Sequence, residues 1–89
     1  MIYEIALGQG KGVQLIELPI GSEIVDALHH AGSLTLYAMV PPLPHVGHQS
    51  RRIEVVGCGD TITLQHPRHV ASVLTPYNHV VHIFEEGQQ

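Results

Sequence analysis

The feature that most constrains the fold of this chain is a series of short runs in which apolar and polar residues alternate, each ended by glycine or proline. In the clearest run, Ser33–Val40, every second residue is apolar: Leu34, Leu36, Ala38 and Val40. A period of two places these side chains on one face of a β-strand, whereas an amphipathic helix needs a period of about 3.6 residues. The pattern therefore predicts strands.

Runs of the same kind predict most of the remaining strands: Ile2–Leu7, Val13–Leu18, Arg51–Val56, Thr61–Leu64, Val70–Thr75 and His79–Glu85. Ser22–His30 is ambiguous, because Ser22 could cap a helix and the apolar residues after it fit a helical face. The run is short for a helix, and Ala31-Gly32 permits a tight turn into the next strand. We therefore predict a strand at Ser22–His30, with a short helix as the alternative.

Glycine and proline clusters between these runs predict the connections. Gly8–Gly12, Ala31-Gly32 and Pro76-Tyr77-Asn78 each join two neighbouring strands into a hairpin. The proline-rich segment 41–49 forms the main loop, and His66-Pro67-Arg68 is a further break. Seven or eight short strands at roughly ten-residue spacing predict an all-β fold, a small antiparallel sandwich or barrel.

The size of the chain suits one domain, residues 1–89, in which residues 86–89 form a short polar tail. A domain this small buries a modest fraction of its surface, so its stability usually depends on disulfides, a metal or self-association. Cys58 is the only cysteine, which excludes an internal disulfide. With 44% apolar residues, the chain is expected to form a homo-oligomer.

No leader and no membrane span are expected. Met1 leads directly into an alternating run, and no apolar run approaches the roughly 20 residues that cross a bilayer. A secreted domain of this size would be expected to carry several cysteines. The sequence therefore predicts a cytoplasmic protein without a membrane partner.

The charge of the chain argues against one class of partner. The four cations (Lys11, Arg51, Arg52 and Arg68) stand against eight carboxylates, which gives a formal net charge of −4. Proteins that hold DNA or RNA neutralise several phosphates with a basic face. The sequence therefore predicts no polymeric nucleic acid as partner, whereas a small anionic ligand needs only one to three of these cations.

Several stretches along the chain carry a family resemblance. They are residues 2–5 (IYEI), 16–24 (IELPIGSEI), 36–40 (LYAMV), 53–60 (IEVVGCGD), 73–75 (VLT) and 80–86 (VVHIFEE). Together they resemble a small phage and bacterial family of unknown function. The resemblance implies a compact β domain, commonly phage-encoded and then located in the host cytoplasm, that acts by binding, for example by sequestering a component of bacterial defence. The glycine-rich first turn, the proline-rich loop and the many histidines depart from the family pattern.

Two adjacent arginines are the first candidates for holding an anionic ligand. Arg51 and Arg52 point to opposite faces of a strand, so one faces solvent and the other must form an ion pair or contact a ligand. Arginine suits bidentate contact with phosphate or carboxylate. A salt bridge to Glu54 or Glu4 would explain the same residue without a ligand.

Four further residues complete the predicted ligand contacts. Lys11 lies in Gly8–Gly12, whose open backbone amides could hold a phosphate, although an ordinary hairpin turn without a Walker pattern is the simpler explanation. Arg68 would add charge, and Tyr37 or Tyr77 would provide a surface for stacking a base. The predicted contacts are therefore Arg51, Arg52, Lys11, Arg68, Tyr37 and Tyr77.

Histidine is the compositional outlier, with eight residues. A spacing of three points His79 and His82 to opposite faces of a strand, so they cannot share an ion there. The pairs in predicted loops could ligate a metal such as zinc: His45, His48, His66 and His69. No cysteine cluster or HExxH motif accompanies them, and surface histidines are the simpler explanation. We predict no cofactor, with these four residues as the alternative metal ligands.

The sequence contains no catalytic signature. Cys58 lies between two glycines without the surroundings of a cysteine hydrolase, and Glu54 and Asp60 lie on separate predicted elements. We therefore predict a non-enzymatic protein that sequesters a small anionic, nucleotide-like signalling ligand of bacterial anti-phage defence. The alternatives are a protein–protein inhibitor of a host factor, using a sheet edge or the Pro41–Pro44 loop, and a histidine-rich metal-binding domain.

Overall fold

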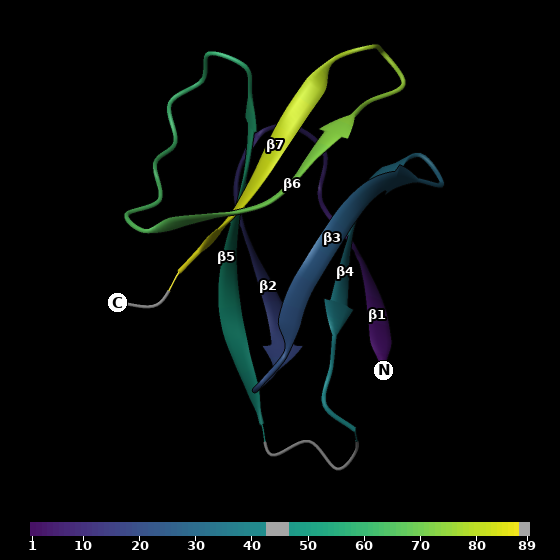
Figure 1. Ribbon diagram of the computed structural model, residues 1–89, viewed down its shortest axis with the longest axis vertical. Helices are drawn as coiled ribbons and strands as arrows, with labels where there is room; N and C mark the ends of the chain where they lie inside the picture. The colour runs from purple at the N-terminus through teal and green to yellow at the C-terminus, as the bar shows by residue number, and fades with distance from the viewer. Residues whose placement is uncertain (43–46, 88–89) are drawn as a thin grey trace.

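The computed structural model describes residues 1–42 and 47–87, and this part of the chain is all-β (Figure 1). Its strands are β1 (Ile2–Ala6), β2 (Gly12–Pro19), β3 (Glu23–His30), β4 (Ser33–Met39), β5 (His48–Gly57), β6 (Pro67–Leu74) and β7 (Val80–Glu86). They form two antiparallel sheets, with strand orders β1-β4-β3 and β2-β5-β7-β6. The predicted all-β class and antiparallel sandwich are confirmed. No helix in these residues has the length and apolar character needed to cross a membrane.

The core forms where the alternating apolar residues of the two sheets face each other. Ile24 and Leu36 of the three-stranded sheet and Ile53 and Ile83 of the four-stranded sheet are at most 2% exposed. Burial of each such side chain stabilises the fold by about 1.5–3 kcal/mol. The strand alternation read from the sequence therefore corresponds to an inward and an outward face in the structure.

The β3–β4 hairpin confirms the strand predicted at Ser22–His30 and rules out the helix. His30 pairs with Ser33, so only Ala31 and Gly32 form the turn, with φ angles of 51° and 81°. Two positive φ values are typical of the two-residue turns that match the twist of antiparallel strands. The β6–β7 hairpin is also confirmed, and Figure 1 shows the two hairpins reaching toward the same end of the molecule, at the upper right.

The predicted hairpin between Ile2–Leu7 and Val13–Leu18 is wrong. β1 pairs with β4 and β2 pairs with β5, so the first two strands belong to different sheets. The N–H of Leu7 donates to the carbonyl of Leu34 at 2.8 Å, which extends the pairing with β4 to the end of the first run. The chain then crosses to the other sheet through Gly10 and Gly12, whose φ angles of 90° and 119° favour glycine.

The strand predicted at Thr61–Leu64 is also wrong. The N–H groups of Thr63 and Leu64 donate to the Glu54 carboxylate at 2.8 and 3.2 Å, and the Thr63 hydroxyl donates to it at 2.7 Å. A side chain of β5 therefore takes the donors that a strand would give to a neighbour, and the segment loops between β5 and β6 (Figure 1, upper left).

The expected break at His66-Pro67-Arg68 is shorter than predicted, because Pro67 begins β6. β6 is an edge strand, and proline is tolerated at the first position of such a strand. Glu86, expected in the polar tail, is the last residue of β7. Residues 88 and 89 of that tail, and Leu43 and Pro44 of the proline-rich loop, lie outside the described residues.

Candidate functional site

Three charged residues on neighbouring strands of the four-stranded sheet meet at a pocket of about 390 Å³. Arg51 of β5 is two residues before the core residue Ile53, and Glu85 of β7 is two residues after the core residue Ile83, so both charged residues share the inward face of the sheet. Arg68 of β6 is directly opposite Glu85 in the strand register. We call this site the arginine pocket; its lining is Ile20, Gly21, Ser22, Gln49, Arg51, Arg68, Glu85, Glu86 and Gly87.

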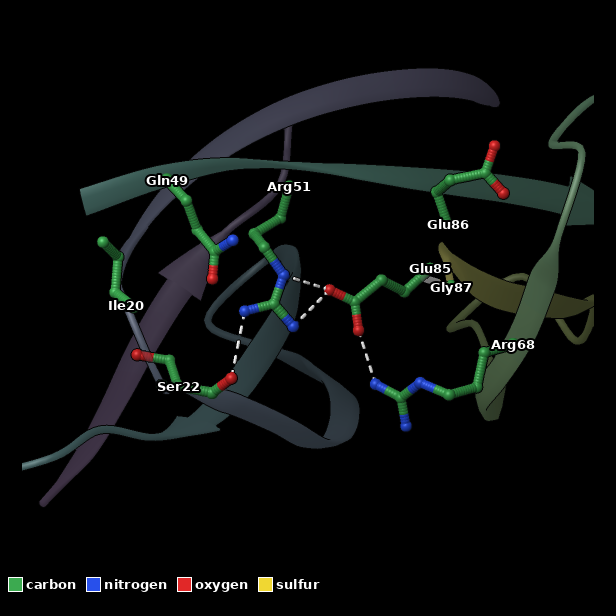
Figure 2. Close-up of a pocket in the computed structure, with 9 residues that line it drawn as sticks. Ile20, Ser22, Gln49, Arg51, Arg68, Glu85, Glu86 and Gly87 are labelled. Carbon is green, nitrogen blue, oxygen red and sulfur yellow. Dashed lines mark hydrogen bonds and ion pairs between the residues drawn. The ribbon is translucent and has the colours of Figure 1, made fainter. Parts of the chain in front are cut away.

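The Glu85 carboxylate is shared between the two guanidinium groups (Figure 2). Arg51 donates through Nε and Nη2 to one carboxylate oxygen, at 2.5 Å, and Arg68 donates through Nη2 to the other. The Glu85 side chain is 3% exposed. A buried charge is costly unless it is paired and hydrogen-bonded, and here each oxygen has its own cationic partner. The three residues together carry a net charge of +1.

Both arginines keep N–H donors that no group in residues 1–42 and 47–87 accepts. Arg51 also donates from Nη1 to the Ser22 carbonyl at 3.0 Å, and its side chain is 16% exposed. The Arg68 side chain is 47% exposed, and its one ion-pair partner in the described part of the chain is Glu85. A guanidinium group carries five N–H donors in a planar fork. Arg68 therefore offers most of its fork to a molecule that enters the pocket.

Glu86 contributes negative charge at the rim of the pocket. Its oxygens accept hydrogen bonds from the N–H groups of Gln65 and His66, at 3.1 and 2.6 Å. Figure 2 shows its carboxylate directed away from the two guanidinium groups. The four charged lining residues thus sum to zero formal charge, with Glu85 between the two arginines and Glu86 apart from them.

The predicted ligand contacts divide among several places. Arg51 and Arg68 meet in the arginine pocket, whereas Lys11 and Tyr77 line a second, larger cleft among the turns.

The other two predicted contacts lie outside both sites. Arg52 is exposed on the outward face of β5, as expected from its position next to Arg51. Tyr37 lies on the three-stranded sheet and donates its hydroxyl hydrogen to Glu4 at 3.1 Å.

The salt-bridge partner of Arg51 is Glu85, and neither Glu54 nor Glu4, which the sequence suggested. Glu54 is occupied by Thr63 and Leu64. Burial raises the pKa of Glu54, but the hydrogen bonds from Thr63 and Leu64 outweigh it and hold that pKa below its ordinary value. One signal could have identified Glu85: it follows Ile83 by two residues, so a charged side chain stands at an inward position of its strand.

Two further acid–base pairs lie outside the arginine pocket. The Lys11 ammonium hydrogen-bonds Asp60 at 2.8 Å and, with the N–H of Gly57, lowers the pKa of the Asp60 carboxyl. Partial burial and the neighbouring Glu4 raise the pKa of the Tyr37 hydroxyl. Both pairs use charges that are exposed to solvent, so they fix side chains more than they stabilise the fold.

The histidines do not assemble into a metal site in residues 1–42 and 47–87, where no three His, Cys, Asp or Glu side chains converge on one point. His45 lies outside the described residues. His69 packs its ring edge-on against Phe84 and hydrogen-bonds Ser72, while His66 binds Glu86 through its backbone. His48 begins β5.

A contact that the sequence did not suggest links Cys58 to His82. The thiol lies 3.4 Å from Nε2 of His82, whose Nδ1 lies 2.8 Å from the Ser72 hydroxyl. The group spans the outward face of β6 and β7 and the turn after β5. A cysteine catalyst also needs donors for the oxyanion and a bound substrate beside the thiol. The absence of catalytic function stays a prediction.

Comparison with known proteins places the chain in one family. The family described as a domain of unknown function, DUF7352, matches residues 1–89. No curated protein and no solved structure matches the chain. The resemblance to a small family of unknown function is thereby confirmed. The chain belongs to the DUF7352 family.

Proposed function

We propose that this protein is a non-catalytic binding protein for a small anionic ligand, and that the arginine pocket holds the ligand's phosphate or carboxylate. The observation that carries this proposal is the convergence of Arg51 and Arg68 on one shared carboxylate beside an open pocket. Because the two guanidinium groups share a single buried carboxylate, they keep N–H groups that can donate hydrogen bonds to an oxyanion. Planar forks of this kind bind phosphate and carboxylate groups bidentately.

The two arginines have different roles in this proposal. Arg51 is largely buried and is held by Glu85 and the Ser22 carbonyl, so it fixes the geometry of the pocket. Arg68 is half-exposed and makes one ion pair, so it provides the direct contact to the ligand. A volume of about 390 Å³ is within the lower part of the range for small-molecule sites, roughly 300–1,000 Å³.

The biological setting belongs to the same proposal. A nucleotide-like signalling molecule carries the phosphate that the pocket suits, and a phage protein that sequesters it would weaken bacterial defence from within the host cytoplasm. Self-association is supported by apolar side chains exposed on edge strands, namely Ile2 of β1 and Val13 and Leu15 of β2.

The test compares one arginine of the pocket with one outside it. Binding of inorganic phosphate, AMP and cyclic nucleotides is measured by titration calorimetry and native mass spectrometry for the wild type, Arg68→Ala and Arg52→Ala. Both variants remove one positive charge, but Arg52 faces away from the pocket. A charge-assisted hydrogen bond contributes about 1.5–3 kcal/mol to the binding free energy, so its loss in Arg68→Ala should weaken binding about tenfold or more. Arg52→Ala should leave the affinity unchanged.

Two results would overturn the proposal. One is that none of these anions binds to the wild type at millimolar concentration. The other is that Arg68→Ala and Arg52→Ala weaken binding equally, because charge would then act at a distance and not through the pocket. Arg68→Lys separates charge from shape: it keeps the charge, and a partial loss of affinity would indicate that the planar fork is used.

A further inference from the structure

A second cavity, of about 920 Å³, lies at the opposite end of the sandwich and is formed by turns. We call it the loop cleft. Its walls are Gly8–Lys11, the start of β4 with the turn before it, Gly57-Cys58 and Thr75–His79. β5 runs from the arginine pocket at Arg51 to the loop cleft at Gly57, six residues later, which at strand geometry is a separation of about 20 Å. One small ligand cannot occupy both sites.

The charge of the loop cleft is one-sided. None of the described residues that line it is an aspartate or a glutamate, although the chain carries eight carboxylates and a net charge of −4. Lys11 supplies a positive charge, and His29 and His79 supply imidazole groups. Asp60 pairs with Lys11 but does not line the cleft. The described lining therefore presents one ammonium group and no carboxylate, which favours an anion over a cation.

The inner wall of the cleft is apolar. Leu7 and Val55 are buried core residues that reach its inner surface, and Leu34 and Val81 are partly buried beside them. A small ion without an apolar part would leave this apolar surface in contact with water. The lining therefore suits a molecule with an apolar or aromatic part as well as an anionic group.

An aromatic ring stands at the edge of the cleft on a well-fixed turn. Tyr77 is 84% exposed, so its ring packs against little of the protein. The turn beneath it is held by hydrogen bonds from Thr75 N–H to the His79 carbonyl, at 2.7 Å, and from Asn78 N–H to the Thr75 carbonyl, at 3.0 Å. A ring held out on an ordered turn is available for stacking with little loss of conformational freedom.

The facing wall offers backbone donors. Gly8 is anchored by Gln14, whose side-chain amide bonds both the N–H and the carbonyl of Gly8. The next two N–H groups, of Gln9 and Gly10, have no hydrogen-bond partner in the part of the chain that the structure describes. Successive unpaired amides in a turn are favourable contacts for an oxyanion.

We propose that the loop cleft is a second binding site, which takes an aromatic anion. The aromatic ring stacks on Tyr77 above the apolar wall, and the anionic group contacts Lys11 and the N–H groups of Gln9 and Gly10. This site shares no residue with the arginine pocket, so either proposal can fail without the other.

The probe for the test is anilinonaphthalene sulfonate, a fluorescent aromatic anion, titrated into folded wild-type protein. We expect saturable binding with one probe per chain, and an affinity that falls about threefold or more in both Tyr77→Ala and Lys11→Ala. Arg68→Ala is the control from the other pocket and should bind the probe like the wild type. The uncharged analogue phenylnaphthylamine should bind more weakly and should not respond to Lys11→Ala.

Amide chemical shifts of labelled protein identify the site directly. On titration with the probe, the largest changes should fall on residues 8–11, 32–34, 57–58 and 75–81. Changes centred on the arginine pocket or on the outward sheet faces would overturn the proposal. So would unchanged affinity in both Tyr77→Ala and Lys11→Ala, provided that circular dichroism shows both variants folded.

Discussion

Replacing Glu85 with glutamine would leave two guanidinium groups around one neutral amide in the arginine pocket. Its carboxylate is 3% exposed and bonds Arg51 through one oxygen and Arg68 through the other. The amide keeps one acceptor oxygen and places an NH₂ group against a second donor. Removal of one partner from a buried ion pair costs about 3–5 kcal/mol, and the lower end applies because Arg68 is half-exposed and regains water. A domain of this size loses about 4–8 °C in Tm per kcal/mol, so Glu85→Gln should lower Tm by about 12 °C or more.

Two other substitutions test the reasoning in the same thermal unfolding measurement by circular dichroism. Arg68→Ala leaves the buried Glu85–Arg51 pair intact and removes only the more exposed partner, so it should cost about 1 kcal/mol or less. Glu17→Gln is the matched control, because Glu17 is an exposed carboxylate on edge strand β2 that accepts from the Ser50 hydroxyl. It should change stability by about 0.5 kcal/mol or less. All proteins are compared at one concentration, since self-association would make Tm depend on it. A Glu85→Gln protein as stable as Glu17→Gln would refute the reasoning, as would equal losses in Glu85→Gln and Arg68→Ala.

Two further predictions concern the turns and loops. Because the pKa of Glu54 is lowered in the folded protein, the unfolded chain binds the extra proton, and the stabilisation by Glu54 is present above the ordinary value of 4.5 and lost as pH falls through the folded pKa. The free energy of unfolding of the wild type, measured with urea, should therefore fall as pH is lowered below 4.5. The same free energy should depend less on pH in Glu54→Gln. An identical pH dependence in the two proteins would contradict this. Ala31 has a φ of 51° in the β3–β4 turn, where a Cβ is unfavourable, so Ala31→Gly should stabilise the protein by about 0.5–1 kcal/mol. A lower Tm in Ala31→Gly would show that the turn does not carry this strain.

The faces of the strands could be predicted from alternation, but the partner of each strand could not. Ser33–Val40 alternates with a period of two, and β4 buries Leu36 and Ala38 as that period requires. The first run alternates as well, yet its partner is β4 and not the next strand along the chain. Alternation depends on one buried face and says nothing about which edge supplies the hydrogen bonds. Proximity in sequence was the only available guide, and the connection Gly8–Gly12 is long enough to change sheets.

The candidate site could be predicted in its residue types but not in its grouping. Arg51 and Arg68 are 17 residues apart in the sequence and meet only because β5, β7 and β6 are neighbours in one sheet. Glu85, which holds them together, is visible in the sequence as a charge two residues after the buried Ile83. Thr61–Leu64 shows the opposite case: it alternates like a strand, but the Glu54 carboxylate binds its backbone. Side-chain acceptors of this kind compete with strand pairing and leave no periodic signal.

The two pockets differ because the interior of the sandwich ends differently at its two ends. Along β5 and β7 the inward positions are apolar at Ile53 and Ile83 and become charged at Arg51 and Glu85, so an ion cluster lines the opening at this end. At the other end the inward positions stay apolar, at Val55 and Val81, until the turns begin. Charge at an opening selects ligands by hydrogen bonds and sign, whereas an apolar wall selects them by shape and buried area. Inorganic phosphate should therefore prefer the arginine pocket, because it has no apolar part to bury in the loop cleft.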